Sequence, residues 1–151
     1  MSTETPQYLT FDISASAESP TKTRVSTRGF EFIVDEPPTL GGSDEGPNPV
    51  EFLLGALAGC MNVTAHQVAR EMDLDVRDLE ITIDGDLDPA KFMGKSDESR
   101  AGYEEIRVDI AADVDATDET IQTWLSMVEE RCPVSDNLTN GTPLDLAFSS
   151  R

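Results

Sequence analysis

Apolar and polar residues alternate through the first third of the chain, a pattern typical of half-buried β-strands. The alternation covers residues 8–17, then residues 22–27 and 30–34, and Arg28-Gly29 separates the last two segments. These segments predict three strands in an antiparallel meander. Residues 35–49 contain too many prolines and glycines for a regular element, so we expect a loop there.

A long apolar helix is predicted over residues 49–72. Asn48 is a good N-cap, and Pro49 suits the first helical position, where its missing N–H group costs nothing. Gly55 and Gly59 each destabilise a helix interior by roughly 1 kcal/mol relative to alanine. Glycines in such a run indicate that another helix or a partner chain packs very close. The helix is apolar nearly all round in its first half, which is typical of a core helix.

Alternation returns over residues 79–87 and 106–112, which predicts two strands with one solvated face. The polar segment between them, residues 88–102, is long enough to form a lid.

A second helix is predicted between Thr117, which is a good N-cap, and Pro133, which ends it. Its apolar stripe consists of Ile121, Trp124, Leu125 and Val128. Residues 143–148 alternate again and predict a closing strand. The predicted order is βββ-α-ββ-α-β within one domain of residues 1–151. Runs of strands separated by two helices indicate the α+β class.

The charge of the chain excludes some classes of partner. Its 30 acidic and 11 basic residues give a net charge of -19. Nucleic acids and anionic membrane surfaces bind clusters of lysine and arginine, so neither is expected as a partner. Because the apolar residues are periodic, a disordered acidic protein is disfavoured. We favour a folded domain from a halophile, since concentrated salt would screen its self-repulsion.

The sequence carries no signal for export or for a membrane. Its first residues lack the basic and apolar regions of a signal peptide. The longest strongly apolar stretch, residues 52–63, is too short and interrupted for a membrane span. We therefore expect a cytoplasmic protein, in which a disulfide between the two cysteines would be transient or catalytic.

The two cysteines, Cys60 and Cys132, are the candidates for chemistry. Spacing alone favours Cys60 as an inert buried thiol, because it shares a helix face with apolar residues. Cys132 precedes Pro133 and is predicted as the N-cap of a short helix over residues 134–138. A helix N-terminus and the adjacent Arg131 would lower the pKa of its thiol. A capping role without chemistry fits Cys132 equally well.

No metal or cofactor is expected. His66 is the only histidine, and the two cysteines are too far apart in the sequence for a zinc-binding spacing. His66 is also turned roughly 120° from Cys60 around the predicted helix. The glycine motifs that bind phosphates or dinucleotides do not occur.

Two sequence blocks, taken together, resemble the OsmC/Ohr family, the osmotically inducible protein C and organic hydroperoxide resistance proteins. The first block is Leu40-Gly41-Gly42-Ser43-Asp44-Glu45-Gly46-Pro47-Asn48-Pro49 with the helix to Cys60, and the second is Glu130-Arg131-Cys132-Pro133-Val134-Ser135-Asp136-Asn137. The resemblance implies an intertwined homodimer of α+β subunits with active sites at the subunit interface. In peroxidase members, the cysteine matching Cys60 attacks the peroxide and becomes a sulfenic acid. The cysteine matching Cys132 then forms a disulfide with it, and an external dithiol reduces both.

The chain departs from the peroxidase pattern at two activating positions. Val50 occupies the place of a glutamate, and Glu51 lies one residue further on, about 100° around the helix. No arginine aligns with the family's activating arginine near the first strand turn. Arg24 and Arg28 are the available candidates.

The sequence thus predicts a cytoplasmic, dimeric thiol peroxidase that acts on organic hydroperoxides. Cys60 is the attacking thiol and Cys132 the resolving one, Arg24 or Arg28 stabilises the thiolate, and Glu51 orients the site. A dithiol reductant is the expected second partner. Two alternatives remain: a non-catalytic dimer that binds a small apolar ligand between its central helices, and a redox sensor that is oxidised without turnover.

Overall fold

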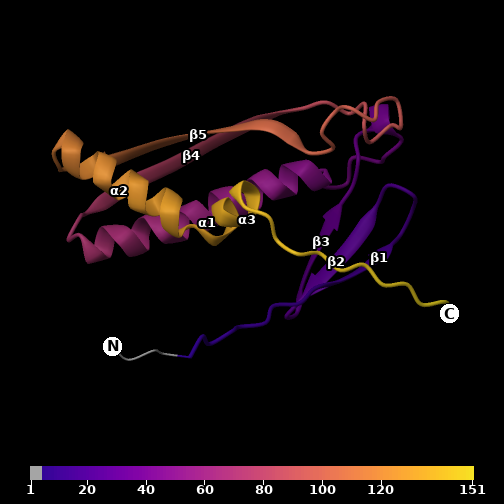
Figure 1. Ribbon diagram of the computed structural model, residues 1–151, viewed down its shortest axis with the longest axis horizontal. Coiled ribbons are helices and arrows are strands. Elements are labelled where there is room, and N and C mark those ends of the chain that lie inside the picture. The colour runs from indigo at the N-terminus through magenta and orange to yellow at the C-terminus, as the bar shows by residue number, and fades with distance from the viewer. Residues whose placement is uncertain (1–4) are drawn as a thin grey trace. The chain divides into compact units, whose positions relative to one another are not determined.

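The computed structural model describes residues 5–151 and divides the chain into two compact units. The first unit ends at Leu53, and the second spans Leu54–Arg151. The described residues form a three-stranded sheet in the first unit and a two-stranded sheet in the second, both antiparallel (Figure 1). Three α-helices accompany these sheets in the described residues, which confirms the α+β class.

The first unit contains the predicted meander. Its strands are β1 (Ser14–Ala17), β2 (Thr23–Thr27) and β3 (Phe30–Val34), paired in that order. Arg28 and Gly29 form the two-residue turn between β2 and β3, with φ of 47° and 87°, as a type I′ turn requires. The first strand is shorter than the predicted 8–17, because residues 8–13 pair with no strand in the described part of the chain.

Asp35, directly after β3, is a fully buried carboxylate that organises the loop before the long helix. Its Oδ1 accepts a hydrogen bond from the N–H of Glu36 at 2.8 Å, and its Oδ2 accepts from Ser43 at 3.1 Å and Glu45 at 3.2 Å. Its own N–H donates to the carbonyl of Pro47 at 3.2 Å. Burial opposes ionisation, but these N–H groups hold the pKa of Asp35 below its ordinary value. The loop is therefore built around one carboxylate.

The helix α1 spans Pro49–Glu71, one residue shorter than predicted. Asn48 is its cap, as expected: its Oδ1 accepts from the N–H of Glu51 at 2.9 Å. Glu51 Oε2 accepts in return from the N–H of Asn48 at 2.8 Å, which completes a capping box. Contrary to expectation, α1 is long and apolar enough to cross a membrane by length and composition alone. One of its faces is buried in the core of the second unit, so a core helix explains the same properties.

The second unit is a β-ribbon with helices on one side (Figure 1). Its elements after α1 are β4 (Val76–Leu87), β5 (Tyr103–Val114), α2 (Asp118–Arg131) and α3 (Pro133–Thr139). Both strands are longer than the predicted segments 79–87 and 106–112. The register shifts between Arg77 and Glu80, where Asp78 has a φ of 49°. This bulge interrupts the alternation of side chains, so the sequence pattern begins only after it.

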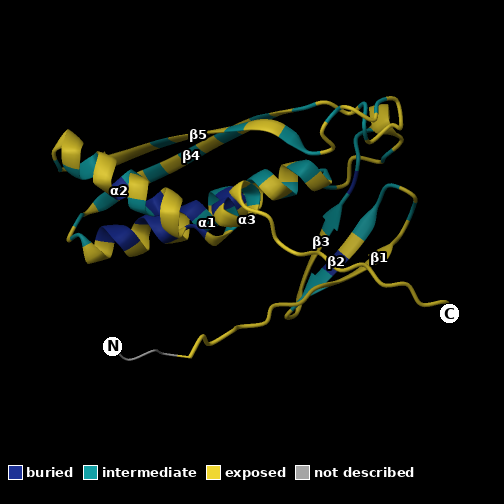
Figure 2. Ribbon diagram, viewed as in Figure 1, coloured by how far each residue is buried: buried dark blue, intermediate teal, exposed yellow. Residues whose placement is uncertain are grey.

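The main core lies where α2 packs on α1, and the most buried residues follow this contact (Figure 2). Its buried members are Ala65, Val68, Ala69, Trp124 and Val128. Trp124 is 2% exposed, and its Nε1 donates a hydrogen bond to the carbonyl of Ala65 at 2.9 Å. Thr117 caps α2 by accepting from the N–H of Thr120 at 3.2 Å. The predicted apolar stripe and cap of α2 are both confirmed.

The closing strand predicted over residues 143–148 does not form within this chain. Its apolar side chains are almost fully exposed, with Leu146 at 94% and Phe148 at 93% (Figure 2). Alternation shows that a segment can lie on a sheet, but a strand also needs a neighbouring edge with which to pair. In the described part of the chain no strand edge takes up this segment.

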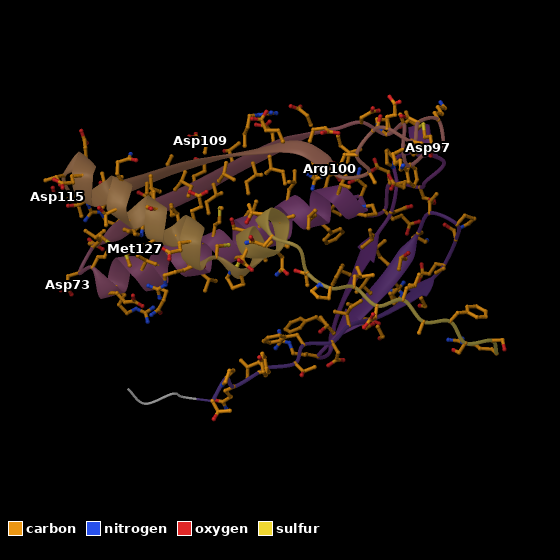
Figure 3. All side chains as sticks on the ribbon, in the orientation of Figure 1. Asp73, Asp97, Arg100, Asp109, Asp115 and Met127 are labelled. Carbon is orange, nitrogen blue, oxygen red and sulfur yellow. The ribbon has the colours of Figure 1, made fainter. Side chains whose placement is uncertain are left out.

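Acidic side chains occupy exposed positions over the second unit, among them Asp73, Asp109 and Asp115 (Figure 3). Arg107 on β5 offsets part of this charge. Its guanidinium pairs with three carboxylates from the two strands: Asp84, Asp86 and Glu105. The folded, dispersed acidic surface fits the expectation from the sequence, and the halophilic source remains a prediction.

Candidate functional site

The fold brings the two cysteines together in one apolar cluster, although 72 positions separate them in the sequence. Cys60 lies on α1, and Cys132 is the single residue between α2 and α3. Their side chains are within hydrogen-bonding contact, and both are free thiols. The other members of the cluster are Leu57, Met61, Ile81, Ile83, Ile106, Val134 and Leu138. This pair can in principle cycle between a dithiol and a disulfide.

Cys132 is the N-cap of α3, as predicted, and its Sγ accepts a hydrogen bond from the N–H of Ser135 at 3.5 Å. The expected lowering of its pKa is wrong. The side chain is 0% exposed, and this burial raises the pKa of the thiol above its ordinary value. The neighbouring Cys60 raises it further, and the N–H groups of Ser135 and Val134 oppose both effects without cancelling them. Cys132 therefore remains a protonated thiol at neutral pH.

Cys60 is only partly buried whereas Cys132 is fully buried, so Cys60 is the more exposed residue of the pair. Its backbone carbonyl accepts a hydrogen bond from the hydroxyl of Thr64, four residues further along α1, at 2.9 Å. The spacing of Cys60 favours an inert, buried thiol. The observed burial matches that description at Cys132, not at Cys60. The two thiols thus occupy different environments, one accessible and one sealed.

Glu51 is used by the helix cap described above. Both the carboxylate and the N–H of Glu51 bond to Asn48, and the side chain is exposed. Val50, where the resemblance implies a glutamate, occupies the preceding position on α1. The structure therefore gives Glu51 a local contact that the sequence analysis did not assign to it.

The two candidate arginines have different surroundings in the first unit. Arg24 on β2 lies between two carboxylates, with Nε 2.6 Å from Glu18 and Nη1 3.9 Å from Glu31. Arg28 lies in the β2–β3 turn, where its guanidinium carbon is 5.4 Å from the centre of the Phe30 ring. No carboxylate lies within ion-pair distance of Arg28 among the described residues. Among the described residues, Arg28 is therefore the candidate whose guanidinium is not already paired with a carboxylate.

Arg131, expected to act on the neighbouring thiol, is paired instead with Glu71 at the end of α1. Its Nη1 lies 2.6 Å from one carboxylate oxygen of Glu71, and its Nη2 lies 2.9 Å from the other. Gln67 Nε2 donates to the same carboxylate at 2.9 Å. Glu71 could not be predicted from the sequence, because no local pattern links residues that lie 60 positions apart.

Comparisons with known proteins agree on the fold. The family model of OsmC-like proteins matches residues 42–147. An OsmC-like protein from Mycoplasma pneumoniae superposes with a TM-score of 0.77 at 20% identity, over 89% of this chain and 91% of that one. An organic hydroperoxide resistance protein from Elizabethkingia anophelis gives a TM-score of 0.64 at 20% identity, over 91% and 92%.

A further similar structure is an organic hydroperoxide resistance protein OsmC from Legionella pneumophila. It gives a TM-score of 0.63 at 21% identity and covers 90% of this chain and 93% of its own. At these identities the structural likeness establishes the fold alone. None of the curated protein sequences matches this chain significantly.

Proposed function

Because this chain belongs to the family of OsmC-like proteins, we propose that it is a thiol peroxidase that reduces organic hydroperoxides. The observation that carries the proposal is the contact between an accessible thiol, Cys60, and a sealed one, Cys132, in an apolar cluster. A peroxidase of this type needs one sulfur that meets the substrate and a second one that is protected until the first is oxidised.

The reaction balances with these two residues and one external reductant. The thiolate of Cys60 attacks the O–O bond, so that its sulfur gains the terminal oxygen as a sulfenic acid, and the remaining alkoxide leaves as an alcohol after taking up a proton. The thiol of Cys132 then displaces hydroxide from that sulfur, which gives a disulfide and water. The two electrons accepted by the peroxide come from the thiol pair, and a dithiol restores them by exchange.

The raised pKa of Cys132 suits the order of these steps. While Cys60 is reduced, burial and the Cys60 side chain keep Cys132 protonated and unreactive. Oxidation of Cys60 to a neutral sulfenic acid removes the repulsion from a Cys60 thiolate. The N–H groups of Ser135 and Val134 remain to stabilise a Cys132 thiolate at that moment. One of the causes that raise the pKa of Cys132 is thereby removed after the first step, although its burial remains.

The apolar cluster favours an organic rather than an inorganic peroxide. Leu57 and Met61 flank Cys60 on α1, and Ile81, Ile83 and Ile106 of the ribbon pack against the same cluster. Alkyl groups gain free energy by contact with such side chains, whereas hydrogen peroxide gains none. Two similar structures are also named organic hydroperoxide resistance proteins.

We assign the stabilisation of the Cys60 thiolate to Arg28, with Arg24 as the second candidate. A partly buried thiolate needs a nearby positive charge. Arg28 would exchange only a ring contact for the thiolate, whereas Arg24 would have to leave Glu18 and Glu31. Glu51 would orient the arginine at the cost of its bond to Asn48.

We propose that the protein works as a homodimer in the cytoplasm, where both cysteines would be kept reduced. Within the described part of the chain, a Cβ added at Gly55 or Gly59 would meet nothing within 4 Å. The close packing expected at these two glycines would therefore have to come from a partner chain. The extended segments 8–13 and 143–148 have the alternation of strands and pair with no strand edge in the described part of the chain. Sedimentation equilibrium should give twice the chain mass of 16.4 kDa; a monomer at micromolar concentration would refute the dimer.

The test of the proposed function is oxidation of the fully reduced protein by cumene hydroperoxide. We expect one equivalent of peroxide to remove both free thiols and to form one intramolecular disulfide, detected by mass spectrometry after alkylation. A dithiol should then support repeated turnover. If both thiols survive and a sulfenic acid probe labels neither, the protein is not a thiol peroxidase.

A further inference from the structure

We propose that Arg131 and Glu71 are positioning residues for the thiol pair, and that the ion pair between them holds Cys132 within reach of Cys60. The inference rests on the proposed function, in which the two sulfurs form a disulfide. It assigns a role to two charged side chains that no step of the reaction uses.

The two contacts that α1 makes with the junction of α2 and α3 lie on one face of the helix. Gln67 and Glu71 lie 7 and 11 residues after Cys60, so all three side chains point within about 20° of one direction on the helix. Arg131 and Cys132 are consecutive residues at the junction of α2 and α3. One rigid helix therefore contacts this junction at two places, through a thiol and through a carboxylate.

The ion pair is well suited to restrain that junction. The guanidinium of Arg131 and the carboxylate of Glu71 are joined by two parallel hydrogen bonds of 2.6 and 2.9 Å, a geometry that fixes orientation as well as distance. Gln67 Nε2 donates to Oε1 of Glu71, the oxygen that also accepts from Arg131 Nη2, so three hydrogen bonds hold this carboxylate. Arg131 and then Gln67 lower the pKa of Glu71 to about 2, so the pair persists throughout the pH range in which thiols exchange.

Glu71 is an unfavourable residue for its place in the helix. It is the last residue of α1, where the helix dipole disfavours a negative charge. A lysine or arginine there would stabilise the helix end, but neither could accept the two parallel hydrogen bonds from Arg131. We call this doubly bonded Arg131–Glu71 ion pair the fork. The fork offsets this local cost, so a glutamate at this position is explained by the junction rather than by the helix.

Cys132 depends on this restraint because it lies in a connection rather than within a helix. A disulfide requires Cα atoms about 4.4–6.8 Å apart, so a small displacement of the junction lowers the effective concentration of one thiol at the other. The hydrogen bond from the N–H of Ser135 to Cys132 Sγ is weak, because thiol sulfur is a poor acceptor, and it cannot hold the junction by itself. The fork supplies a second attachment, one residue away.

The test is the equilibrium between the dithiol and the disulfide in glutathione buffers, followed by alkylation and mass spectrometry. Cys60 and Cys132 give two electrons and two protons to glutathione disulfide, which becomes two glutathione molecules. In Arg131→Met and Glu71→Gln we expect the equilibrium constant for disulfide formation to fall about three- to fivefold, in keeping with the strength of an exposed ion pair. Arg131→Lys keeps the charge without the fork and should fall in between.

Arg77→Met is the matched control, because it breaks an exposed ion pair on the ribbon, between Arg77 and Asp113 at 3.0 Å. We expect it to leave the equilibrium constant unchanged. A purely structural ion pair would lower the stability of both redox forms equally and would likewise leave the constant unchanged. Unfolding of each reduced variant in urea separates the two effects.

Equal constants in the wild type, Arg131→Met and Glu71→Gln would overturn the inference. The absence of a disulfide from the wild type in oxidised glutathione would overturn it as well, since the fork would then fail to bring the sulfurs together. If the wild type forms the disulfide with glutathione but not with cumene hydroperoxide, the proposed function fails while the positioning role stands.

Discussion

Replacement of Cys60 by serine is expected to abolish the reduction of organic hydroperoxides, with kcat/KM reduced by at least about 10³-fold. A serine hydroxyl is not ionised near neutral pH and forms no stable counterpart of a sulfenic acid, so both the attack and the intermediate are lost. The measurement is the consumption of cumene hydroperoxide with an excess of dithiothreitol.

Cys132→Ser is the matched control for this variant. Without dithiothreitol, which would itself reduce a sulfenic acid, this variant keeps the Cys60 thiol and should consume one equivalent of peroxide, leaving a sulfenic acid on Cys60 that a dimedone probe labels. Retention of turnover by Cys60→Ser would refute the assignment of the attacking sulfur. A different outcome is that the wild type and both variants show no turnover and all three bind a small apolar ligand. The protein is then a non-catalytic ligand-binding protein.

Replacement of Trp124 by alanine is expected to have the largest effect on stability, lowering the free energy of unfolding by about 3–5 kcal/mol. The indole is 2% exposed and fills the contact between α1 and α2. Its loss would leave a cavity and remove the hydrogen bond to the carbonyl of Ala65. Since Trp124 is the only tryptophan, unfolding in urea should be followed by far-ultraviolet circular dichroism rather than by fluorescence.

Trp124→Phe separates the two contributions. Phenylalanine keeps most of the apolar contact but cannot donate to Ala65, so we expect a loss of about 1–2 kcal/mol. All measurements need one protein concentration, because association of subunits would add to the apparent stability. A loss below about 1 kcal/mol in Trp124→Ala would contradict the central role of this side chain in the core.

The elements with strong local signals could be predicted from the sequence. The cap at Asn48, the start of α1 at Pro49 and the turn at Arg28-Gly29 follow from side chains that act within three residues of themselves. Residues 143–148 could not be assigned in this way. Whether they form a strand depends on an edge supplied from elsewhere, and alternation carries no information about such an edge.

In the candidate site, too, features set by local sequence could be predicted and features set by distant segments could not. The motifs around Cys60 and Cys132 identified the pair, and the N-cap position of Cys132 followed from Pro133. The sign of the pKa shift at Cys132 did not follow, because it is decided by burial under segments that are distant in the sequence. The partner of Arg131 could not be predicted for the same reason, because Glu71 meets it only through the packing of α2 on α1.

If the proposed homodimer covers residues 8–13 and 143–148, the lifetime of the protein would depend on its abundance. In the proposed dimer, dilution would release both segments from the partner subunit. Released, they are extended segments with exposed apolar side chains, which are preferred sites of proteolysis. We therefore expect a cell that makes much of this protein to keep each molecule longer, and a cell that makes little to lose it quickly.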